Sequence, residues 1–461
     1  MSCHNIRATV TGTVAVLAGV FSLAGTASAQ VTSVTDVQRQ VDDAFKEVMA
    51  RADSADARER YARLLVQAGN FEGGIAALEG LLLSPDAPAS IRLELAFLYY
   101  RLGSYALAEA YLREALADPR LDEALRQQAN TLLPDVVRRN QTSHLSGSLM
   151  AGLRSQRNPT AASSAGQVLS AGVLVPRDDR TRPRSDVDAH LWGKLDHVYD
   201  LGAQNEAAVV TSLVGYANHF SSVDSHAYRP GNPDPFDVTA IAASSGIRFK
   251  PAPVELPGLT LRPHLILGQM LLNGHKYFTT AGLGLDGNYR LSERLAWGGA
   301  YEARHFSYSS RPDIADSAWA TGNEQSLRVR GAVETGVNRF LTGEIGFIDR
   351  GAGRSYLEFR GTEAKLAYSF SYANPLTNSG VVWTTTLSGS ALRRHFRGAD
   401  PAIDPTIRRR DTERRISLVN SMPLARDLAL QVQFEYTDAP SNLPNYEYSN
   451  FSGAVGVMWK F

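Results

Sequence analysis

The sequence is short of cysteine and of net charge. Its single cysteine is Cys3, and its 47 basic and 47 acidic residues balance to a formal net charge of zero. Cys3 precedes an apolar stretch that runs from Val14 to Ala24 and is followed by small residues at 27–29. This pattern is typical of a secretory signal peptide, which we expect to span residues 1–29 and to be removed.

These absences exclude several classes of protein. Without the signal the chain has no cysteine, so disulfides and thiolate metal sites are excluded. Balanced charge argues against nucleic acid as a partner. After residue 29 no apolar run approaches the roughly 20 residues of a membrane helix. A membrane location would therefore require a closed β-barrel, because only helices and closed barrels satisfy their backbone groups in lipid.

A helical repeat is present in the first part of the chain. The stretches that begin at Ala62 and Ala96 align with a shift of 34 residues, and Pro85 aligns with Pro119 in the same way. The period and the alternation of small and aromatic residues resemble the tetratricopeptide repeat. The residues expected to pack the helix pairs are Ala62, Gly69, Phe71 and Leu78 in one repeat and Ala96, Gly103, Tyr105 and Leu112 in the next.

We expect this helical domain to occupy residues 30–140, with the clear repeats near 52–85 and 86–119. About three repeats are usually needed for stability, so helices near 37–50 and 121–139 are expected to cap the two clear ones. Such a stack offers a docking surface for a peptide or protein. A spacer or assembly scaffold is the alternative.

From residue 141 onward the pattern changes to strict alternation. Leu428, Leu430 and Val432 alternate with polar residues such as Gln431 and Gln433. Apolar residues on one face and charged residues on the other are typical of a barrel with lipid outside and water inside. Residues 141–461 therefore predict an antiparallel barrel of about fourteen strands, near 143–154, 184–198, 204–220, 236–249, 258–273, 274–290, 293–308, 322–336, 337–349, 355–372, 378–394, 410–421, 426–437 and 450–461.

The connections support an even number of strands, because short and long ones alternate along much of the chain. Two places leave twelve or sixteen strands open. The stretch "GQVLSAGVLV", from Gly166, alternates enough to be a strand, and the connection "NGHK", from Asn273, is short for a position where a long loop is expected.

The last strand ends in Trp459 and Phe461, which resemble the C-terminal signal by which outer-membrane barrels are recognised and inserted. The barrel assembly machinery is therefore an expected partner during insertion. We also expect the even strand count to return this end to the periplasm, where terminal aromatics lie at the lipid interface. Part of the opposite aromatic girdle is expected from Tyr436, Tyr446, Tyr448 and Phe451. A soluble β-sandwich is the alternative fold.

The polar parity of the strands predicts the lumen face. Its expected residues are Asp188, Lys194, Arg328, Arg330, Glu334, Glu363, Lys365, Gln431, Gln433 and Glu435. The same reasoning argues against a catalytic site on these strands. Asp188 with His190, and Asp196 with His197, could orient an imidazole, but no GxSxG nucleophile elbow accompanies them. The chain is therefore expected not to be an enzyme, and no catalytic, cofactor-binding or metal-binding residue is predicted.

Two further motifs have ordinary explanations. "GLGLDG" at 282–287 matches the dinucleotide fingerprint, but it lies inside an alternating strand and lacks the helix that would receive a pyrophosphate. No cofactor is expected. The arginine cluster between Arg408 and Arg415 either engages phosphates of lipopolysaccharide or an acidic substrate, or forms a solvated loop that enters a polar lumen.

Signal, short tetratricopeptide region and C-terminal barrel together resemble the surface lipoprotein assembly modulator family. The closing segment carries the local likeness, at Ser441, Asn442, Tyr446, Tyr448, Asn450, Gly456 and Phe461. The resemblance implies a translocon in the cell outer membrane that helps lipoproteins reach the surface, with periplasmic repeats binding the client lipoprotein. The expected partners are that client and outer-membrane lipid. An exopolysaccharide export porin and a general porin are the alternatives.

Overall fold

The structure is a computed structural model, and it describes residues 34–51, 54–83, 87–222, 235–314, 316–376 and 380–461. The predicted signal peptide, 1–29, lies outside the described residues. The chain divides into a helical unit that ends at Thr142 and a barrel unit from Ser143 to Phe461. A helical region followed by an antiparallel barrel was the expected fold, and it is confirmed.

The helical unit contains helix pairs joined by tight turns. Gly69 and Gly103 have φ of +82° and +78°, a conformation that glycine adopts without strain, and each lies at the turn within a pair. The side chains of Ser54, Asn70 and Asp122 cap helix N-termini by accepting backbone N–H bonds. The described helices are α2 (Val34–Ala50), α3 (Ala55–Gln67), α4 (Phe71–Leu81), α5 (Ala89–Arg101), α6 (Tyr105–Ala117) and α7 (Glu123–Asn140).

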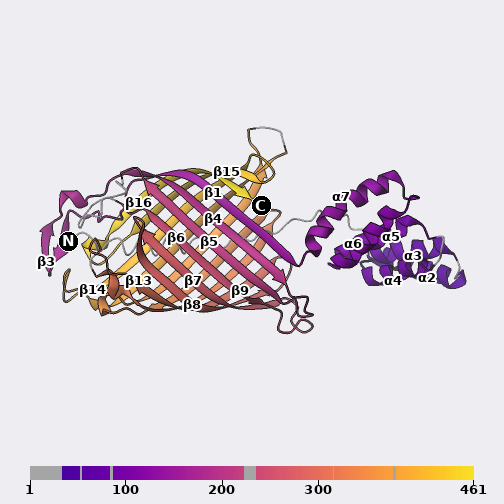
Figure 1. Cartoon of the computed structure of the whole chain (residues 1–461), viewed down its shortest axis with the longest axis horizontal. Coiled ribbons are helices and arrows are strands. Elements are labelled where there is room, and N and C mark those ends of the chain that lie inside the picture. The colour runs from indigo at the N-terminus through magenta and orange to yellow at the C-terminus, as the bar shows by residue number, and fades with distance from the viewer. Residues whose placement is uncertain (1–33, 52–53, 84–86, 223–234, 315, 377–379) are drawn as a thin grey trace. The chain divides into compact units, whose positions relative to one another are not determined.

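The barrel closes through pairing of its first and last strands. β1 pairs with β4 on one side and with β16 on the other, all antiparallel, and the strands run obliquely around the wall (Figure 1). Its fourteen strands are β1 (Ser143–Gln156), β4 (Asp186–Asp200), β5 (Ala208–Phe220), β6 (Val238–Arg248), β7 (Leu259–Leu272), β8 (His275–Arg290), β9 (Leu295–Tyr308), β10 (Gly322–Gly336), β11 (Arg339–Arg350), β12 (Phe359–Ala373), β13 (Val382–Ala399), β14 (Arg408–Pro423), β15 (Leu428–Ala439) and β16 (Tyr448–Lys460).

The two places that left the strand count open have simple structures. "GQVLSAGVLV" folds as a small separate hairpin of β2 (Gln167–Ser170) and β3 (Val173–Pro176), outside the barrel order. The connection between β7 and β8 needs only Asn273 and Gly274. Both residues have positive φ, +50° and +75°, which is the Asn-Gly geometry of a two-residue hairpin turn. A long loop is therefore unnecessary there.

Alternation gives the barrel wall an apolar outer face and a polar inner face. Leu267 on β7 and Leu283 on β8 are outward and about 60% exposed. Side chains of the opposite parity, such as His264 on β7, are enclosed. Among the described residues, the helices are too short or too polar to cross a membrane. We call the end where β1 begins and β16 ends the proximal end, and the other the distal end.

Four residues were predicted for the aromatic girdle opposite the C-terminal end. The predicted position on the outer face is correct for two of them and wrong for the other two. Tyr436 and Phe451 are exposed on the outer face, but Tyr446 and Tyr448 are only 5% and 6% exposed. Tyr448 has the inward parity of β16, and Tyr446 lies in a short 3₁₀ turn, Pro444–Tyr446, where the Arg409 guanidinium stacks 3.3 Å from its ring centroid. Both rings are therefore enclosed among residues at the distal end.

Candidate functional site

The barrel interior is lined by charges that pair across neighbouring strands. The ten residues predicted for the lumen all alternate with outward apolar residues on their own strands: Asp188 and Lys194 on β4; Arg328, Arg330 and Glu334 on β10; Glu363 and Lys365 on β12; and Gln431, Gln433 and Glu435 on β15. Their geometry shows what this interior can do.

The most enclosed charge is Asp188, whose side chain has no exposed surface. Arg154 on β1 donates to both of its carboxylate oxygens, at 3.0 and 2.9 Å, and Gln156 donates at 2.8 Å. Arg154 also donates to the Tyr216 hydroxyl on β5 at 2.9 Å. Such a bidentate, charge-assisted contact is strong and directional. It ties three adjacent strands together from the inside.

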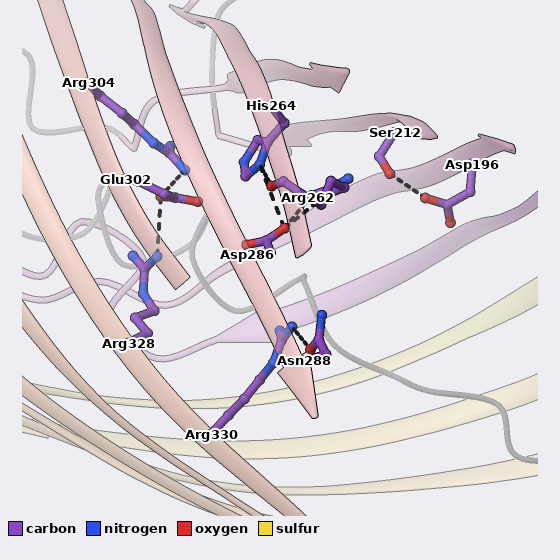
Figure 2. Close-up of polar contacts among 10 residues, drawn as sticks. All are labelled: Asp196, Ser212, Arg262, His264, Asp286, Asn288, Glu302, Arg304, Arg328 and Arg330. Atoms are coloured by element: carbon purple, nitrogen blue, oxygen red, sulfur yellow. Dashed lines mark hydrogen bonds and ion pairs between the residues drawn. The ribbon is translucent and has the colours of Figure 1, made fainter. Parts of the chain in front are cut away.

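Similar groups continue around β7 to β10 (Figure 2). Arg262 on β7 donates to Asp286 on β8 at 2.9 and 2.7 Å, and the His264 ring lies 3.7 Å from the same carboxylate. Glu302 on β9 accepts from Arg304 at 2.5 Å and from Arg328 on β10 at 3.3 Å. Asp286 and Glu302 therefore each lie beside two basic side chains.

Further hydrogen-bonded and ion pairs lie on the inner face, and Figure 2 shows two of them. Arg330 donates to Asn288 at 2.8 Å, and Ser212 donates to Asp196 at 2.6 Å, while Lys194 pairs with Asp196 at 2.8 Å. Lys365 lies between Glu344 and Glu363, at 3.1 and 2.9 Å. On β13 to β15 the chain of pairs is Arg394, Glu413, Arg415 and Glu435. The interior is therefore hydrophilic without a strong excess of either sign.

The two histidine–aspartate groups singled out in the sequence, Asp188 with His190 and Asp196 with His197, do not form close pairs in the structure. Asp196 and His197 turn to opposite faces of β4, since Asp196 bonds to Ser212 inside and His197 bonds to Ser143 at 2.9 Å. His190 shares the inner face with Asp188, but its Nδ1 is 4.0 Å from a carboxylate that Arg154 and Gln156 already occupy. Acid–base catalysis needs a closer, oriented pair.

"GLGLDG" lies within β8, as expected. A Cβ at Gly284 would come within 2.4 Å of the His264 ring, and one at Gly282 would come within 2.4 Å of the Ala303 carbonyl oxygen. Glycine is therefore required here so that inner-face side chains of β7 and the β9 backbone can approach. No helix follows the motif, because β8 continues to Arg290.

Two loops pack against strand residues at the distal end, which the sequence did not reveal. In the β9–β10 loop, Ile314 is fully buried against an aromatic cluster that includes Phe278 and Phe306. Arg311 in the same loop donates to the carbonyl oxygens of Leu272 and His275, both at 3.0 Å. This loop is therefore anchored to the inner side of the β7–β8 turn.

On the other side, the start of the β1–β4 connection packs against β15 and β16. Ala161 is buried with Ala439 and Tyr448. Asn158 donates to the carbonyl oxygens of Ala162 and Ser449, at 2.9 and 3.1 Å. These residues of a long loop gave no periodic signal, so sequence patterns alone could not place them.

The terminal aromatics lie at the proximal end on the outer face. Trp459 and Phe461 are 47% and 48% exposed, and their ring centroids are 4.6 Å apart. The backbone of Phe461 exchanges two hydrogen bonds with Gly147 on β1, at 2.9 and 3.1 Å. Their use as an insertion signal stays a prediction.

The helical unit has two cores that contain the predicted packing residues. Ala62 and Leu78 belong to one core, Ala96 and Leu112 to the other, and all four are buried. Phe71 packs on the first core and Tyr105 on the second, while Gly69 and Gly103 form the turns. Tyr99 and Tyr111 stack at 5.6 Å and belong to the boundary of both cores.

Polar contacts join the alternate helices α3, α5 and α7. Arg63 on α3 donates to Glu94 on α5 at 3.1 Å, and the Tyr100 hydroxyl on α5 donates to Asp135 on α7 at 2.6 Å. That hydrogen bond, with those from Arg139 and Arg138, lowers the pKa of Asp135 to about 2. The face shared by α3, α5 and α7 is therefore charged, and it is the candidate surface for a protein partner.

Comparison with protein families matches a stretch that lies within the barrel unit. The family model described as surface lipoprotein assembly modifier matches residues 200–461. Among curated proteins, none matches this chain. Among solved structures, an anion-selective porin from Comamonas acidovorans is 9% identical, covers 69% of this chain and 99% of its own, and has a TM-score of 0.34.

Two further solved structures have a similar relation to the chain. The outer membrane channel DcaP of Acinetobacter baumannii is 8% identical, with 69% of this chain and 97% of that chain covered and a TM-score of 0.37. A bacterial polysaccharide outer membrane secretin is 9% identical, with 68% and 98% covered and a TM-score of 0.33. At these TM-scores the likeness carries no functional argument.

Proposed function

This chain belongs to the surface lipoprotein assembly modifier family, and from that premise we propose that it assists the passage of lipoproteins through the outer membrane to the cell surface. It is an outer-membrane β-barrel preceded by a helical unit. The single observation that carries the proposal is the family match, which spans more than half of the chain, from residue 200 to residue 461.

In this proposal the barrel interior is the path for the polypeptide. Barrels of about 8 strands are filled by side chains, and porins of about 16 to 18 strands enclose open channels, so fourteen strands lie between these sizes. The paired charges of the wall, such as Arg328 with Glu302, support a path for polypeptide of either charge. A passing chain can exchange hydrogen bonds with these groups without meeting a field of one sign.

The helical unit would bind the client before transfer. Helix pairs of this kind expose long continuous faces, and the face of α3, α5 and α7 carries both acidic and basic groups at Glu94, Arg63 and Asp135. We place this unit in the periplasm, because the even strand count puts both ends of the barrel segment at the proximal end. A non-enzymatic role is the corresponding proposal for the whole chain.

Two further partners belong to the proposal. The exposed outer band contacts outer-membrane lipid. Trp459 and Phe461, exposed beside β1 at the proximal end, would be read by the barrel assembly machinery during insertion.

The test is quantitative surface labelling of lipoproteins in cells from which the gene is deleted, then restored either whole or without residues 31–140. We expect one or a few lipoproteins to leave the surface on deletion while their periplasmic pools remain. The whole gene should rescue them and the shortened gene should not. Barrel abundance in the membrane is measured in both restored strains, so that loss of the barrel is separated from loss of client binding.

Other outcomes would redirect the assignment. An unchanged lipoprotein surface with altered solute uptake would indicate a general porin. An unchanged lipoprotein surface with altered capsule export would indicate an exopolysaccharide export porin. Rescue by the shortened gene would retain the translocon and contradict the role given to the helical unit.

A further inference from the structure

The arginine-rich segment Arg408–Arg415 lies in a strand and not in a loop, and the strand divides it between two faces. The segment begins β14, so its alternate residues point in opposite directions. Arg409 points inward and pairs with Asp411 at 2.6 Å. Arg410 and Arg414 have the other parity and are exposed on the outer wall. The inward arginine belongs to the ion-paired interior, whereas the outward ones need a separate explanation.

Strand register places further basic side chains beside Arg410. His395 on β13 pairs with Arg410, and Arg360 on β12 pairs with His395, so these three side chains form one outward row. In the adjacent outward row, Arg393 lies between Thr362 and Thr412. The three arginines and the histidine are exposed. We call these residues the basic patch: Arg360, Thr362, Arg393, His395, Arg410 and Thr412.

The basic patch contains no carboxylate that would balance its charge. Arg360 reaches Asp349 at the edge of the patch, at 3.4 Å, but these side chains are 76% and 45% exposed, so the pair is weak. In the described part of the chain, the guanidinium groups of Arg393 and Arg410 have no ion pair or hydrogen bond. Outward residues near the distal ends of β9 and β10 are neutral instead: His305, Asn323 and Gln325. Unbalanced positive charge therefore marks one side of the outer wall.

The position of the patch along the strands matches the distal edge of the lipid-facing band. Trp383 and Arg393 share the outer face of β13 and are ten positions apart, with Leu387 and Ala391 between them. At about 3.3 Å per residue and a tilt of about 40°, this separation spans about 25 Å, which is the height of the apolar band of such barrels. Arginine on the lipid face is costly at mid-membrane and tolerated at the edge. Trp383 therefore marks the proximal edge and Arg393 the distal one.

An apolar surface continues from the patch toward mid-membrane. Leu366 on β12 and Ile416 on β14 lie on either side of Gly389 in one outward row, and they are 57% and 60% exposed. Arginine binds phosphate through charge-assisted, bidentate hydrogen bonds, and hydroxyl and imidazole groups can add single ones. A lipid with phosphates at its polar end and several hydrocarbon chains matches both parts of this surface.

We propose that the basic patch binds the phosphate groups of lipopolysaccharide in the outer leaflet, with the acyl chains of that lipid lying over Leu366 and Ile416. The inference goes beyond the proposed function, because this lipid is a resident of the membrane and not the client. It uses the orientation proposed above, in which the distal end faces the cell surface. Bound phosphates offset the repulsion among three neighbouring arginines, which is otherwise destabilising.

A binding experiment tests the patch directly. Diphosphoryl lipid A, the membrane-embedded part of lipopolysaccharide, is titrated into the full-length protein in detergent. The double variant R393Q/R410Q should lower the affinity by about ten-fold or more, because a charge-assisted hydrogen bond contributes about a factor of ten. The matched control is R248Q/R290Q, which removes two exposed arginines from the proximal ends of β6 and β8 and should leave the affinity unchanged. Electrophoretic mobility verifies that each variant is folded.

Three further ligands separate phosphate recognition from general lipid contact. Lipid A without its phosphates should bind the wild type as weakly as diphosphoryl lipid A binds R393Q/R410Q. Phosphatidylglycerol should bind more weakly than diphosphoryl lipid A, and inorganic phosphate should not displace it. Equal affinities of wild type and R393Q/R410Q, or of lipid A with and without phosphates, would overturn the proposal. Displacement by inorganic phosphate, or equally tight binding of phosphatidylglycerol, would overturn the assignment to lipopolysaccharide.

Photocrosslinking in cells tests the same site in its own membrane. A photoreactive amino acid at position 391, the next outward residue to Arg393, should form adducts with lipopolysaccharide, and R393Q/R410Q should reduce their yield several-fold. The yield at position 325 on β10 should not depend on R393Q/R410Q. Adducts with phospholipid alone at position 391 would overturn the site and contradict the orientation of the barrel.

The surface display of lipoproteins, measured in the same strains, separates this inference from the proposed function. Loss of display on deletion of the gene, together with equal lipid A affinities of wild type and R393Q/R410Q, would overturn the lipopolysaccharide site and leave the proposed function standing. Unchanged display on deletion, together with selective binding of diphosphoryl lipid A, would contradict the proposed function and retain the site.

Discussion

Asp188 and Asp196 show how differently two carboxylates of one strand contribute to the barrel. Asp188 is fully enclosed and accepts hydrogen bonds from Arg154 and Gln156. The side chains of Asp196 and of its partner Lys194 are each about a third exposed. Removing one partner of an enclosed pair leaves an uncompensated charge, which costs about 3–5 kcal/mol in dry interiors. Exposed pairs contribute about 0–1 kcal/mol.

We therefore expect Asp188→Ala to destabilise the barrel by up to about 3 kcal/mol and Asp196→Ala by less than about 1 kcal/mol. The measurement is the urea midpoint of unfolding of the purified protein in detergent, followed by the mobility shift of folded barrels on electrophoresis. Equal midpoints for the two variants would show that the Arg154 site is hydrated and weakly coupled.

Asp135 provides a pH-dependent test in the helical unit. The Tyr100 hydrogen bond, then those from Arg139 and Arg138, lower its pKa to about 2, below the roughly 3.9 of an unfolded aspartate. Because the folded pKa is the lower one, ionised Asp135 stabilises the fold fully above about pH 4, and this contribution is lost as the pH falls toward the folded pKa.

Tyr100→Phe should raise the pKa of Asp135 and reduce the stabilisation at neutral pH, so that α5 and α7 lose less of their protection on acidification. Hydrogen exchange of the full-length protein at neutral and acid pH measures this. Asp135→Asn, which cannot ionise, should remove the whole of this pH dependence, including the shares from Arg138 and Arg139. An identical acid response in wild type and Tyr100→Phe would mean that this hydrogen bond does not set the pKa.

Helix α6 contains two leucines in opposite environments. Leu112 is fully buried between helix pairs, and Leu107 is 46% exposed. Leu112→Ala should destabilise the helical unit by about 2–5 kcal/mol through lost burial and a cavity. Leu107→Ala should change stability by less than about 0.5 kcal/mol. Protease digestion of the helical unit in the full-length protein, under native conditions, compares the two. Similar digestion rates would contradict the packing of Leu112.

The elements also show how far the sequence could be interpreted. The alternation of apolar and polar residues located the fourteen barrel strands, because successive side chains of a single strand point to opposite faces of the sheet. Cross-strand partners such as Arg154 and Asp188 lie 34 residues apart and depend on strand register, which local pattern does not fix. The alternation along β16 would have placed Tyr448 on the inner face together with Asn450, so its wrong assignment to the outer girdle was avoidable. Tyr446 was not predictable, because a stacked arginine from β14 holds it in a turn.

For the whole molecule, the test of the path is whether a client touches the inner face and not the outer one. Gln433 and Val432 are neighbours on β15, in mid-strand, and face inward and outward respectively. A photoreactive amino acid is placed at each position in turn, in cells exporting lipoproteins, and adducts are identified by mass spectrometry. We expect lipoprotein adducts from position 433 and lipid adducts from position 432.

The physical basis is the closed wall of the barrel. A polypeptide in the interior is separated from position 432 by the hydrogen-bonded ladder of β14, β15 and β16, so it cannot reach both positions without opening a strand pair. Position 330, beside Asn288, provides a second inward probe on β10. Adducts with lipoprotein at 432 as well as 433 would indicate a path that runs through an opened strand pair, and none at 433 or 330 during active export would exclude the interior as the path.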